Sequence, residues 1–594
     1  MVNISNNRGG LGINVITNIR YGGRLLGACL LFAVAATIPG RQLHAQTQEA
    51  INALSRQAEI LQRQQQDLLR QDLERAKKAL PNVGGADLRR ADPETPVGED
   101  ARCRQVDELV IEGAEHLRKA TAEQLAERYT GRCLGVAEIE QILGLVTKDY
   151  IEQGYITTRA YLPGQDLSGG RLRIVVIEGS IEDYRLEGEG ASRIFVPGAF
   201  PGGAGDKLNL RDLEQGIDQI NRLASNRATM EIVPGSMPGK SVVVIRNKKT
   251  FPAHLYLGYD NLGSEATGKE ARTITATLDA PLGLNERWMV TQRRSHPHDP
   301  EHNSQSTSLD FWIPLGKSSL AFNVSRSTYE NVLQLPSGKG LKTNGETLNQ
   351  ALTVDRVAYR DQAGKLSFYA RLSAQDSRNY ILDQLMEISS RKLSQIDLGV
   401  NAFMLLGGGV LTSQIVYSKG LRLFDALEDP AGINDDAPRA QFSKVNVDLG
   451  FSRAFSLASV PFNWSSQLSY QYAETPLYGS QQIQIGSNSS VRGFSLNSLS
   501  GDRGYYWRNE LALPWQFAIA GETVGGRVYA GYDVGRVRGL AQGASRGTLA
   551  GSTIGIAVQW RGASWELYSS RPVDLPVGMQ KESPQTWFRV SYAL

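Results

Sequence analysis

The stretch Thr553-Ile-Gly-Ile-Ala-Val-Gln-Trp560 decides the fold of this chain. Its even-numbered residues, from Ile554 to Trp560, are large and apolar, whereas the residues between them are small or polar. Because successive side chains of a β-strand point to opposite faces, this alternation predicts a strand with one apolar face. An α-helix would instead repeat its apolar residues every three or four positions.

The same alternation extends from about residue 252 to the end of the sequence, with no convincing helix. Further examples are Ile274-Ala276-Leu278, Leu309-Phe311-Ile313, Leu320-Phe322-Val324, Val445-Val447-Leu449-Phe451, Leu468-Tyr470-Tyr472 and Phe588-Val590-Tyr592-Leu594. At about 21 residues for each strand and its connection, the region predicts roughly sixteen strands.

Short and long gaps alternate between these strands. We expect tight turns at 281–285, 314–317 and 362–365, and long loops at 328–350, 419–440 and 472–504. Short turns on one rim and long loops on the other are typical of an outer-membrane barrel. We therefore predict a transmembrane antiparallel β-barrel over 249–594. A soluble multi-domain β protein is the alternative.

The N-terminus has the pattern of an export signal. Two arginines precede an apolar run from Leu25 to Ile38, a Pro-Gly pair ends the run, and Ala45 offers a small residue for cleavage. We therefore expect a signal peptide over 1–45, which together with the barrel predicts the bacterial outer membrane. No stretch of about 18 apolar residues predicts a transmembrane helix.

The balance of charges and the number of cysteines limit which classes of protein this chain can belong to. The chain has 64 basic and 61 acidic residues, and four of the arginines lie in the signal, which has no acid. The near-neutral remainder argues against a nucleic-acid binder. Cys29 lies in the signal, which leaves Cys103 and Cys133. One cysteine pair in an exported protein suggests a disulfide, with two free thiols as the alternative.

No arrangement of residues predicts an enzyme. Gly316-Lys317-Ser318 and Gly239-Lys240-Ser241 resemble the end of a phosphate-binding loop, but both lack its upstream glycine. His296, His298 and His302 are of a type that binds transition metals, but we interpret them as solvated side chains of an external loop. We expect no catalytic residue, no cofactor and no metal.

A different pattern covers residues 47–80. Apolar residues recur there every three or four positions among Gln, Arg, Glu and Asp, which predicts one long polar helix. Its length of about 50 Å exceeds the thickness of a bilayer, but the helix is too polar to face lipid. It can form a weak coiled coil or lie in a polar cavity, and the periodicity alone slightly favours the coiled coil. Residues 81–101 predict a linker.

Two α+β modules of about 70 residues are expected between the linker and the barrel. In the first, 102–179, we expect strands at 106–111, 156–162 and 172–177 and helices near 116–129 and 136–152. In the second, 180–248, we expect strands at 181–186, 230–233 and 242–245, and a helix over 210–223 with Asn209 as N-cap.

The segment Val491-Arg492-Gly493-Phe494 lies in the predicted loop 472–504. Glycines around it let this loop fold into a barrel lumen, where an arginine can meet an inward-facing carboxylate. One strand later comes Gly531-Tyr-Asp-Val-Gly535. From the four residues alone, an exposed loop arginine is the simpler interpretation.

With these motifs the chain, over 46–594, resembles the outer-membrane transporters of two-partner secretion (TpsB type), a family within the superfamily of POTRA-bearing barrels. The matching segments are Val491-Arg-Gly-Phe494, Gly131-Arg-Cys-Leu134, Gly154 to Pro163, Gln165-Asp-Leu167, Glu178-Gly179, Leu208 to Gln215, Asp260-Asn261 and Thr267-Gly268. The chain departs from the pattern at Leu594, where such barrels usually have an aromatic residue.

The resemblance implies an architecture. It consists of a plug helix 46–80, a linker 81–101, two POTRA domains at 102–179 and 180–248, and a sixteen-stranded barrel whose loop 472–504 enters the lumen. The resemblance thus favours the plug over the coiled coil. It also implies that Arg492 pairs with Asp533 on the barrel wall, with Val491, Gly493, Phe494 and Gly535 as parts of the same motif.

The resemblance also implies a function. Such a pore recognises a large secreted partner (TpsA type) in unfolded form through periplasmic POTRA domains and moves it to the cell surface without ATP. Outer-membrane lipid and, during biogenesis, the barrel-assembly machinery are further expected partners; nucleic acid is not. The candidate partner-binding strands are Ile156, Thr157, Thr158, Arg159, Ala160, Tyr161 and Leu162, and Met230, Glu231, Ile232 and Val233.

Two alternatives differ in class. A factor that inserts other barrels is disfavoured because only two POTRA-like modules fit and because a plug helix is present. A passive porin would leave the modules without a role. The identity of the cargo stays open among an adhesin, a haemolysin, a haem-scavenging protein and a growth-inhibition toxin.

Overall fold

The computed structural model describes residues 55, 57–72, 74, 103–189, 193–334, 340–519 and 521–594. The predicted signal peptide, the predicted linker and both ends of the predicted N-terminal helix lie outside the described residues. Residues 57–72 and 74 are helical, as the sequence predicts. In the described part of the chain, no helix combines the length and the apolar character needed to cross a membrane.

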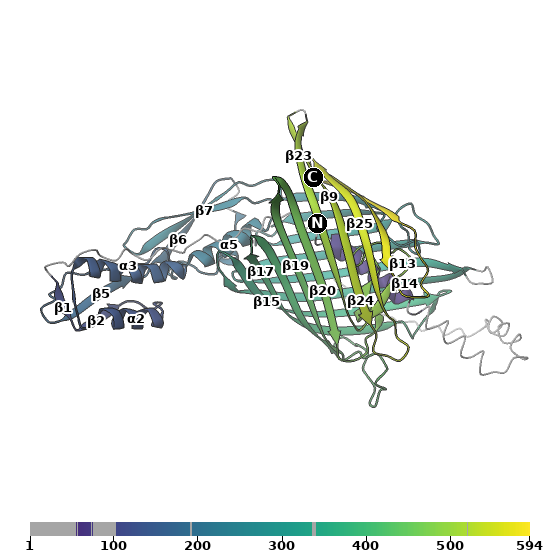
Figure 1. Cartoon of the computed structure of the whole chain (residues 1–594), viewed down its shortest axis with the longest axis horizontal. Coiled ribbons are helices and arrows are strands. Elements are labelled where there is room, and N and C mark those ends of the chain that lie inside the picture. The colour runs from purple at the N-terminus through teal and green to yellow at the C-terminus, as the bar shows by residue number, and fades with distance from the viewer. Residues whose placement is uncertain are drawn as a thin grey trace, which may run out of the picture. The chain divides into compact units, whose positions relative to one another are not determined.

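The first module is a three-stranded sheet covered by two helices (Figure 1). Its strand order is β2-β5-β4, and a separate ribbon pairs β1 with β3. The elements are β1 (Arg104–Val106), β2 (Glu108–Glu112), α2 (Lys119–Tyr129), β3 (Arg132–Leu134), α3 (Val136–Glu152), β4 (Arg159–Tyr161) and β5 (Arg171–Ile177). Buried side chains from α3 and β5, such as Ile142 and Leu172, form its core. A disulfide joins Cys103 to Cys133, so the start of the module is tied covalently to β3.

The predicted strand 156–162 is wrong over part of its length. Only Arg159–Tyr161 is β4, whereas residues 156–158 form a turn in which the Thr158 N–H donates to Tyr155 O (3.1 Å). The Thr158 hydroxyl also accepts the Gly179 N–H (3.1 Å), which ties the turn to the exit of the module. Alternating side chains cannot reveal this bond between residues 21 positions apart.

The second module has the same plan. Its sheet has the order β6-β8-β7, with β6 (Ser180–Glu187), β7 (Ala228–Pro234) and β8 (Lys240–Asn247). The helices are α4 (Val196–Ala199) and α5 (Leu210–Asn221). The Asn209 side chain accepts the Arg211 N–H (2.9 Å), as expected of the predicted N-cap. Leu213 and Ile220 of α5 pack against Val243 and Ile245 of β8.

The rest of the described chain is a closed antiparallel barrel. Its sixteen long strands are β9 (Ala253–Asp260), β10 (Ala271–Asp279), β11 (Arg287–Ser295), β12 (Asn303–Leu315), β13 (Ser318–Gln334), β14 (Gly340–Arg360), β15 (Gly364–Ile381), β17 (Arg391–Leu406), β18 (Gly409–Leu421), β19 (Ser443–Leu457), β20 (Val460–Ala473), β23 (Arg503–Ile519), β24 (Glu522–Arg538), β25 (Arg546–Trp560), β26 (Ala563–Asp574) and β27 (Gln585–Ala593). A two-residue strand, β16 (Gln384–Leu385), extends one hairpin. The barrel closes where β27 pairs with β9 over five residue pairs, whereas β23 and β24 pair over seventeen.

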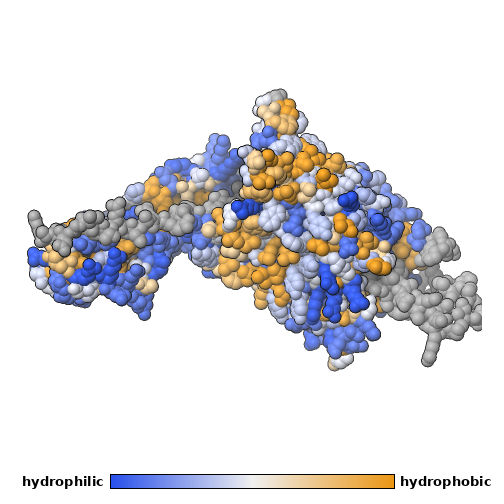
Figure 2. All heavy atoms as spheres, in the orientation of Figure 1, coloured by the Kyte–Doolittle hydropathy of each residue, from blue (hydrophilic) through white to orange (hydrophobic). Residues whose placement is uncertain are grey.

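The alternation read from the sequence separates the two faces of the wall. In β25 the Ile554 side chain is exposed on the outside, whereas its neighbour Thr553 is buried. Figure 2 shows apolar residues gathered over the barrel strands, as a lipid-facing surface requires. The small and polar side chains that alternate with the apolar ones in the strands point into the lumen.

The connections confirm most of the expected turns and loops. Residues 316–317 and 361–363 are short turns, and 422–442 and 474–502 are long loops. The predicted loop 328–350 is wrong, because β13 continues to Gln334 and β14 begins at Gly340. Ladder hydrogen bonds hold this hairpin beyond the apolar band, where no apolar face is needed.

The short turns meet the second module. The Gln219 amide of α5 donates to Gly316 O (3.1 Å), Lys317 pairs with Asp212 (2.7 Å), and Arg360 pairs with Asp218. Counted along the sixteen long strands from β9, these turns follow the fourth strand (β12) and the sixth (β14), so turns after even positions lie at the end of the barrel that carries the modules. Loops after odd positions, including 474–502 after the eleventh strand (β20), lie at the opposite end.

Candidate functional site

The lumenal loop 474–502 places Arg492 against the barrel wall. Its guanidinium donates to both carboxylate oxygens of Asp533, through Nε to Oδ2 (2.7 Å) and Nη2 to Oδ1 (2.9 Å). The Arg492 backbone N–H also donates to Oδ2 (3.1 Å), and Nη1 donates to Glu510 (3.2 Å). All three side chains are largely buried. This bidentate pairing fixes both the position and the orientation of the loop.

Strand alternation explains why these carboxylates face inward. Asp533 lies on β24, where its neighbour Tyr532 is exposed on the outer face. Glu510 lies on β23 and also accepts a hydrogen bond from Arg527 (2.8 Å), so four charged side chains of alternating sign form one chain. Sequence reasoning missed Glu510 and Arg527. Extending the period-two pattern of β23 and β24 would have placed both in the lumen.

Glycines let the motif approach the wall. Gly493 has φ +106°, and a Cβ there would lie 2.6 Å from the Arg571 carbonyl oxygen. A Cβ on Gly551 would lie only 1.8 Å from Arg492 O, and one on Gly535 would lie 2.9 Å from Val491 Cγ2. The ladder between β25 and β26 shifts register at Gly551. The wall is thus shaped locally to receive the motif.

An apolar cluster completes the seat of the loop. Val491 and Phe494 are fully buried and pack with Ile485 of β21 (Ile483–Ile485), Leu499 of β22 (Leu499–Gly501) and Leu549 of β25. β21 and β22 form a small ribbon inside the loop. Ion pairs and apolar packing therefore hold the same segment.

The N-terminal helix also contacts the lumenal wall. Asp72 accepts hydrogen bonds from Arg293 Nη1 (3.1 Å) and Thr273 (3.2 Å). Arg293 in turn donates to both oxygens of Asp260 (2.6 and 2.9 Å). Arg589 of β27 lies 3.5 Å from Asp260 and 3.9 Å from Asp72. The helix thus carries one charge of a cluster at the joint between the first and last strands, a cluster that the sequence did not reveal.

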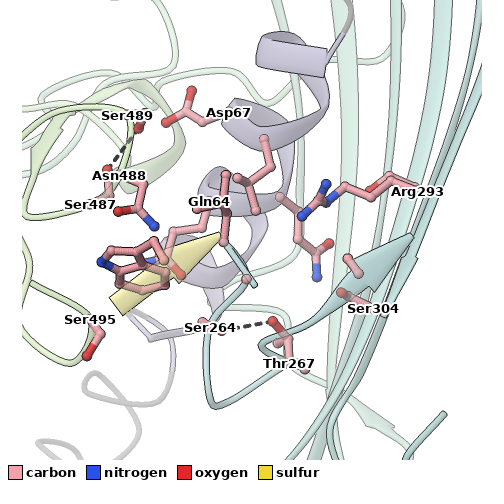
Figure 3. A pocket seen from close by; sticks show the side chains of 18 of the residues that line it. Gln64, Asp67, Ser264, Thr267, Arg293, Ser304, Ser487, Asn488, Ser489 and Ser495 are labelled. Carbon is pink, nitrogen blue, oxygen red and sulfur yellow. Dashed lines mark hydrogen bonds between the residues drawn. The ribbon is translucent and has the colours of Figure 1, made fainter. Parts of the chain in front are cut away.

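Further along, the helix makes polar contacts. Gln62 donates to Asn379 Oδ1 (2.9 Å), Glu59 pairs with Arg391, and Arg63 donates to Gly479 O of the lumenal loop (3.3 Å). A cavity of about 60 Å³ separates part of the helix from the loop and the wall, and Figure 3 shows Gln64, Asp67 and Arg293 around it. These contacts favour the plug over the coiled coil.

The candidate partner-binding strands lie at sheet edges. β4 and β7 are each bonded on one side only within their sheets. The side chains of Tyr161, the last residue of β4, and of Leu162, which follows it, are about half exposed. The Ala160 N–H donates to Thr147 of α3 (3.4 Å), and the Ala228 N–H donates to Asn221 of α5 (2.6 Å). β2 and β6 are edges as well, which the sequence could not show because it does not give strand order.

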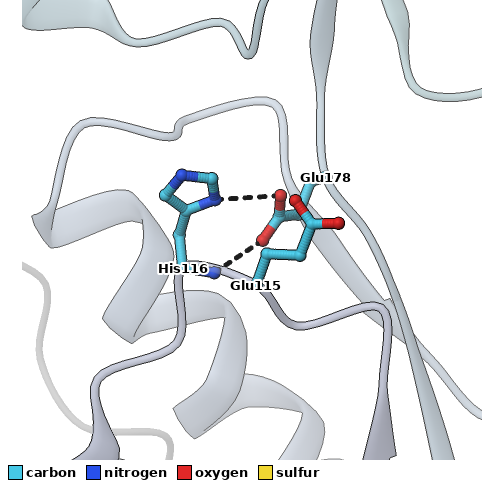
Figure 4. Close-up of side chains that lie close together, drawn as sticks. All are labelled: Glu115, His116 and Glu178. Carbon is cyan, nitrogen blue, oxygen red and sulfur yellow. Dashed lines mark hydrogen bonds and ion pairs between the residues drawn. The ribbon is translucent and has the colours of Figure 1, made fainter.

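A buried carboxylate joins the two modules. Glu178 accepts hydrogen bonds from Tyr150 (2.7 Å) and from the His116 N–H (2.9 Å), and Lys207 of the second module lies 2.9 Å away. Figure 4 shows Glu178 beside His116 and Glu115. Burial opposes ionisation, but these hydrogen bonds outweigh it and lower the pKa of Glu178 to about 2. Glu115, His116 and Glu178 are the described ligand types close enough to share a metal. The Lys207 ammonium already supplies a positive charge next to Glu178. The site is therefore better explained as an ion pair that clamps the two modules together than as a metal site.

The three loop histidines do not join that group. They lie between β11 and β12, where the only ion pair that the structure gives them in this described segment links His302 to Asp299 (3.6 Å). The interpretation as loop side chains stays a prediction.

Comparison with known families matches the chain in three parts. Residues 239–558 match the family described as haemolysin secretion/activation protein ShlB/FhaC/HecB. Residues 105–179 match the ShlB-type POTRA domain, and residues 180–234 match a POTRA domain.

Individual relatives agree with this assignment. The outer membrane transporter CdiB of Dickeya dadantii is 32% identical over 82% of this chain and 86% of its own length. The hemolysin transporter protein ShlB of Serratia marcescens is 30% identical over 84% of this chain and 88% of its own. The solved structure of CdiB from Escherichia coli superposes with a TM-score of 0.81 at 31% identity, covering 91% of this chain and 98% of that one.

These matches confirm the resemblance drawn from the motifs, and they describe transporters rather than enzymes. The chain belongs to the ShlB/FhaC/HecB family and is an outer-membrane β-barrel transporter of the two-partner secretion type, with POTRA domains.

Proposed function

We propose that this transporter binds one large secreted exoprotein in unfolded form at the edges of its POTRA sheets. The exoprotein then passes through the barrel after the N-terminal helix withdraws. The observation that carries the proposal is the polar seat of that helix: Asp72, Gln62 and Glu59 hold it by ion pairs and hydrogen bonds. Water can replace such contacts at little net cost, unlike a packed apolar core.

The dimensions fit this route. A helix with its side chains is about 10 Å wide, so a lumen that accommodates one accommodates an extended chain. A folded domain of about 100 residues is more than twice as wide. The cargo therefore crosses unfolded, and its folding at the cell surface supplies direction without ATP.

Recognition at β4 and β7 rests on their open edges. An edge strand offers main-chain groups that its sheet does not pair, and an extended segment can add to it with little demand on sequence, displacing Thr147 and Asn221 from the Ala160 and Ala228 N–H groups. Tyr161 and Leu162, at the end of β4, add exposed apolar surface for the side chains of the incoming segment. In this account Arg492 and Asp533 hold the lumenal loop and carry out no chemistry.

Two further partners belong to the proposal. The lipid-facing residues contact outer-membrane lipid, and the alternating strand β27 is the segment that the barrel-assembly machinery recognises during biogenesis. For the cargo, the name of one relative, a hemolysin transporter, supports a large secreted exoprotein.

The test compares the proteins that cells with and without this gene release, by mass spectrometry. Loss of one very large secreted protein, with outer-membrane proteins unchanged, is the expected result and identifies the cargo. A broad fall in outer-membrane barrels with no single missing secreted protein would show an assembly factor instead.

A further inference from the structure

The last external loop, residues 575–584 between β26 and β27, binds the lumenal loop through one side chain. Glu582 is 6% exposed and accepts hydrogen bonds from three consecutive backbone N–H groups: those of Ser495 (2.7 Å), Leu496 (3.1 Å) and Asn497 (2.7 Å). The Ser495 hydroxyl (2.9 Å) and the Asn497 amide (2.7 Å) donate to the same carboxylate. Five donors from the residues directly after the Val-Arg-Gly-Phe motif thus converge on one acceptor.

The site is built for an anion. Successive backbone N–H groups that point at one centre form a nest that favours negative charge. Burial opposes ionisation of Glu582, but the backbone hydrogen bonds outweigh it and lower its pKa. No lysine or arginine forms an ion pair with Glu582 among those that the described residues contain, so backbone donors do the holding.

Apolar contacts reinforce the link. Leu575 and Met579 of the same external loop pack against the cluster that buries Val491 and Phe494. The Asn497 side chain donates in addition to Gln580 O (2.8 Å). The external loop therefore covers the motif and holds the segment that follows it.

We propose that Glu582 is a positioning residue, and that loop 575–584 is a latch that locks the lumenal loop from the outside. Arg492 fixes the loop to the wall on one side of Gly493, and Glu582 fixes it on the other. Neither attachment alone defines the path of the loop through the glycine, where φ is positive. Opening the latch frees the segment after the motif while the Arg492 pair stays formed.

Cysteine labelling on whole cells tests this with the full chain. Leu499, 8% exposed, lies in the lumenal loop after the motif, and Ser389, 1% exposed, lies in another loop of the same rim. Each is replaced by cysteine and exposed to a membrane-impermeant maleimide. Because Cys103 and Cys133 form a disulfide, they give no background.

We expect Glu582→Ala and Glu582→Gln to raise the labelling rate at Leu499→Cys about tenfold, since both remove the charge that the nest binds. The rate at Ser389→Cys stays unchanged. Glu428→Gln, which changes an exposed carboxylate of loop 422–442, alters neither rate.

Two results would overturn the proposal. An unchanged rate at residue 499 in Glu582→Ala would show that the latch holds nothing, and equal rises at both reporters would show general loosening of the barrel. The labelling needs no secreted partner, so its failure is distinct from failure of the proposed function.

Discussion

The lumenal loop and the N-terminal helix use the same chemistry for different purposes. Both place an Arg–Asp pair on the barrel wall, Arg492 with Asp533 and Asp72 with Arg293. The loop adds a backbone hydrogen bond, close contacts at glycines and one large buried apolar cluster, whereas the helix adds polar contacts and small apolar ones, such as Leu61 against Tyr329 and Leu69 against Met289. Both ion pairs are buried, so the difference teaches that the packing and backbone contacts around such a pair, more than the pair itself, set how firmly a segment is held.

The largest expected effect follows Arg492→Ala. It leaves Asp533 and Glu510 buried without their shared cation, and breaking a buried pair in this way costs about 3–5 kcal/mol. We expect secretion to fall at least about tenfold while the barrel still assembles. Culture supernatants measure secretion, and the heat-dependent mobility of the barrel in gels measures assembly.

Normal secretion by a well-expressed Arg492→Ala variant would show that the Arg492–Asp533 pair is not needed for secretion. Arg492→Lys keeps the positive charge but loses the bidentate hydrogen bonding. Its level of secretion should therefore lie between that of Arg492→Ala and that of the unchanged chain.

A smaller effect of opposite sign is expected from Asp72→Asn. Arg293 keeps its pair with Asp260, so the barrel is spared while the helix loses its ionic contact. The open fraction of channels in planar bilayers should rise about tenfold, which corresponds to about 1.4 kcal/mol.

The matched control is Arg70→Gln, because the ion pair of Arg70 lies within the helix, to Asp67. Equal conductance changes in both variants would mean that helix charge in general, and not the wall contact, sets the open fraction.

Gly535→Ala tests packing without touching charge. The added methyl would lie 2.9 Å from Val491 Cγ2 and 3.0 Å from Ile485 Cγ2, and overpacking of this kind costs about 1–3 kcal/mol. We expect a few-fold loss of secretion and easier proteolysis of the lumenal loop. Gly525→Ala on the same strand meets only Trp515 O at 4.0 Å and should behave like the unchanged chain.

Glu178 is a buried charge outside the barrel, with which the two ion pairs of the barrel can be compared. We expect the substitution Glu178→Gln to have the smallest effect of those described here. Its pKa of about 2 lies below the usual value of about 4.3, so its stabilisation is full above that value and is lost as the pH falls through about 2. The unfolding temperature of Glu178→Gln should therefore lie below that of the unchanged chain from pH 5 to 7, and the gap should shrink below about pH 4 and close only below about pH 2. A gap that does not shrink between pH 5 and pH 2 would contradict the clamp.

The barrel and the loop motif could be predicted because each depends on local pattern. Alternation over many strands gave their number, whereas the pairing of Arg492 with Asp533 was expected from the resemblance to the transporter family and not from the pattern itself. The motif was recognisable because its four residues are adjacent in the chain.

The helix seat and the latch could not be predicted in this way. Asp72 and Arg293 lie 221 positions apart, and Glu582 binds mainly backbone N–H groups, which leave no mark on the residue types of 495–497. The turn at 156–158 was missed for the same reason, since a hydroxyl contact with Gly179 fixes it. Long-range pairing and backbone recognition require the register of the folded wall.

The joint between β27 and β9 bears on how the wall carries mechanical load. Tension in the plane of the membrane stretches the barrel wall around its circumference. The wall should separate first at its shortest ladder, the five residue pairs between β27 and β9. Asp260 and Arg589 sit at this joint, and Asp72 of the helix lies within reach of Arg589. The helix thus adds an ionic contact at the shortest ladder of the wall, and a barrel from which it had withdrawn, as proposed above, would be more compliant there.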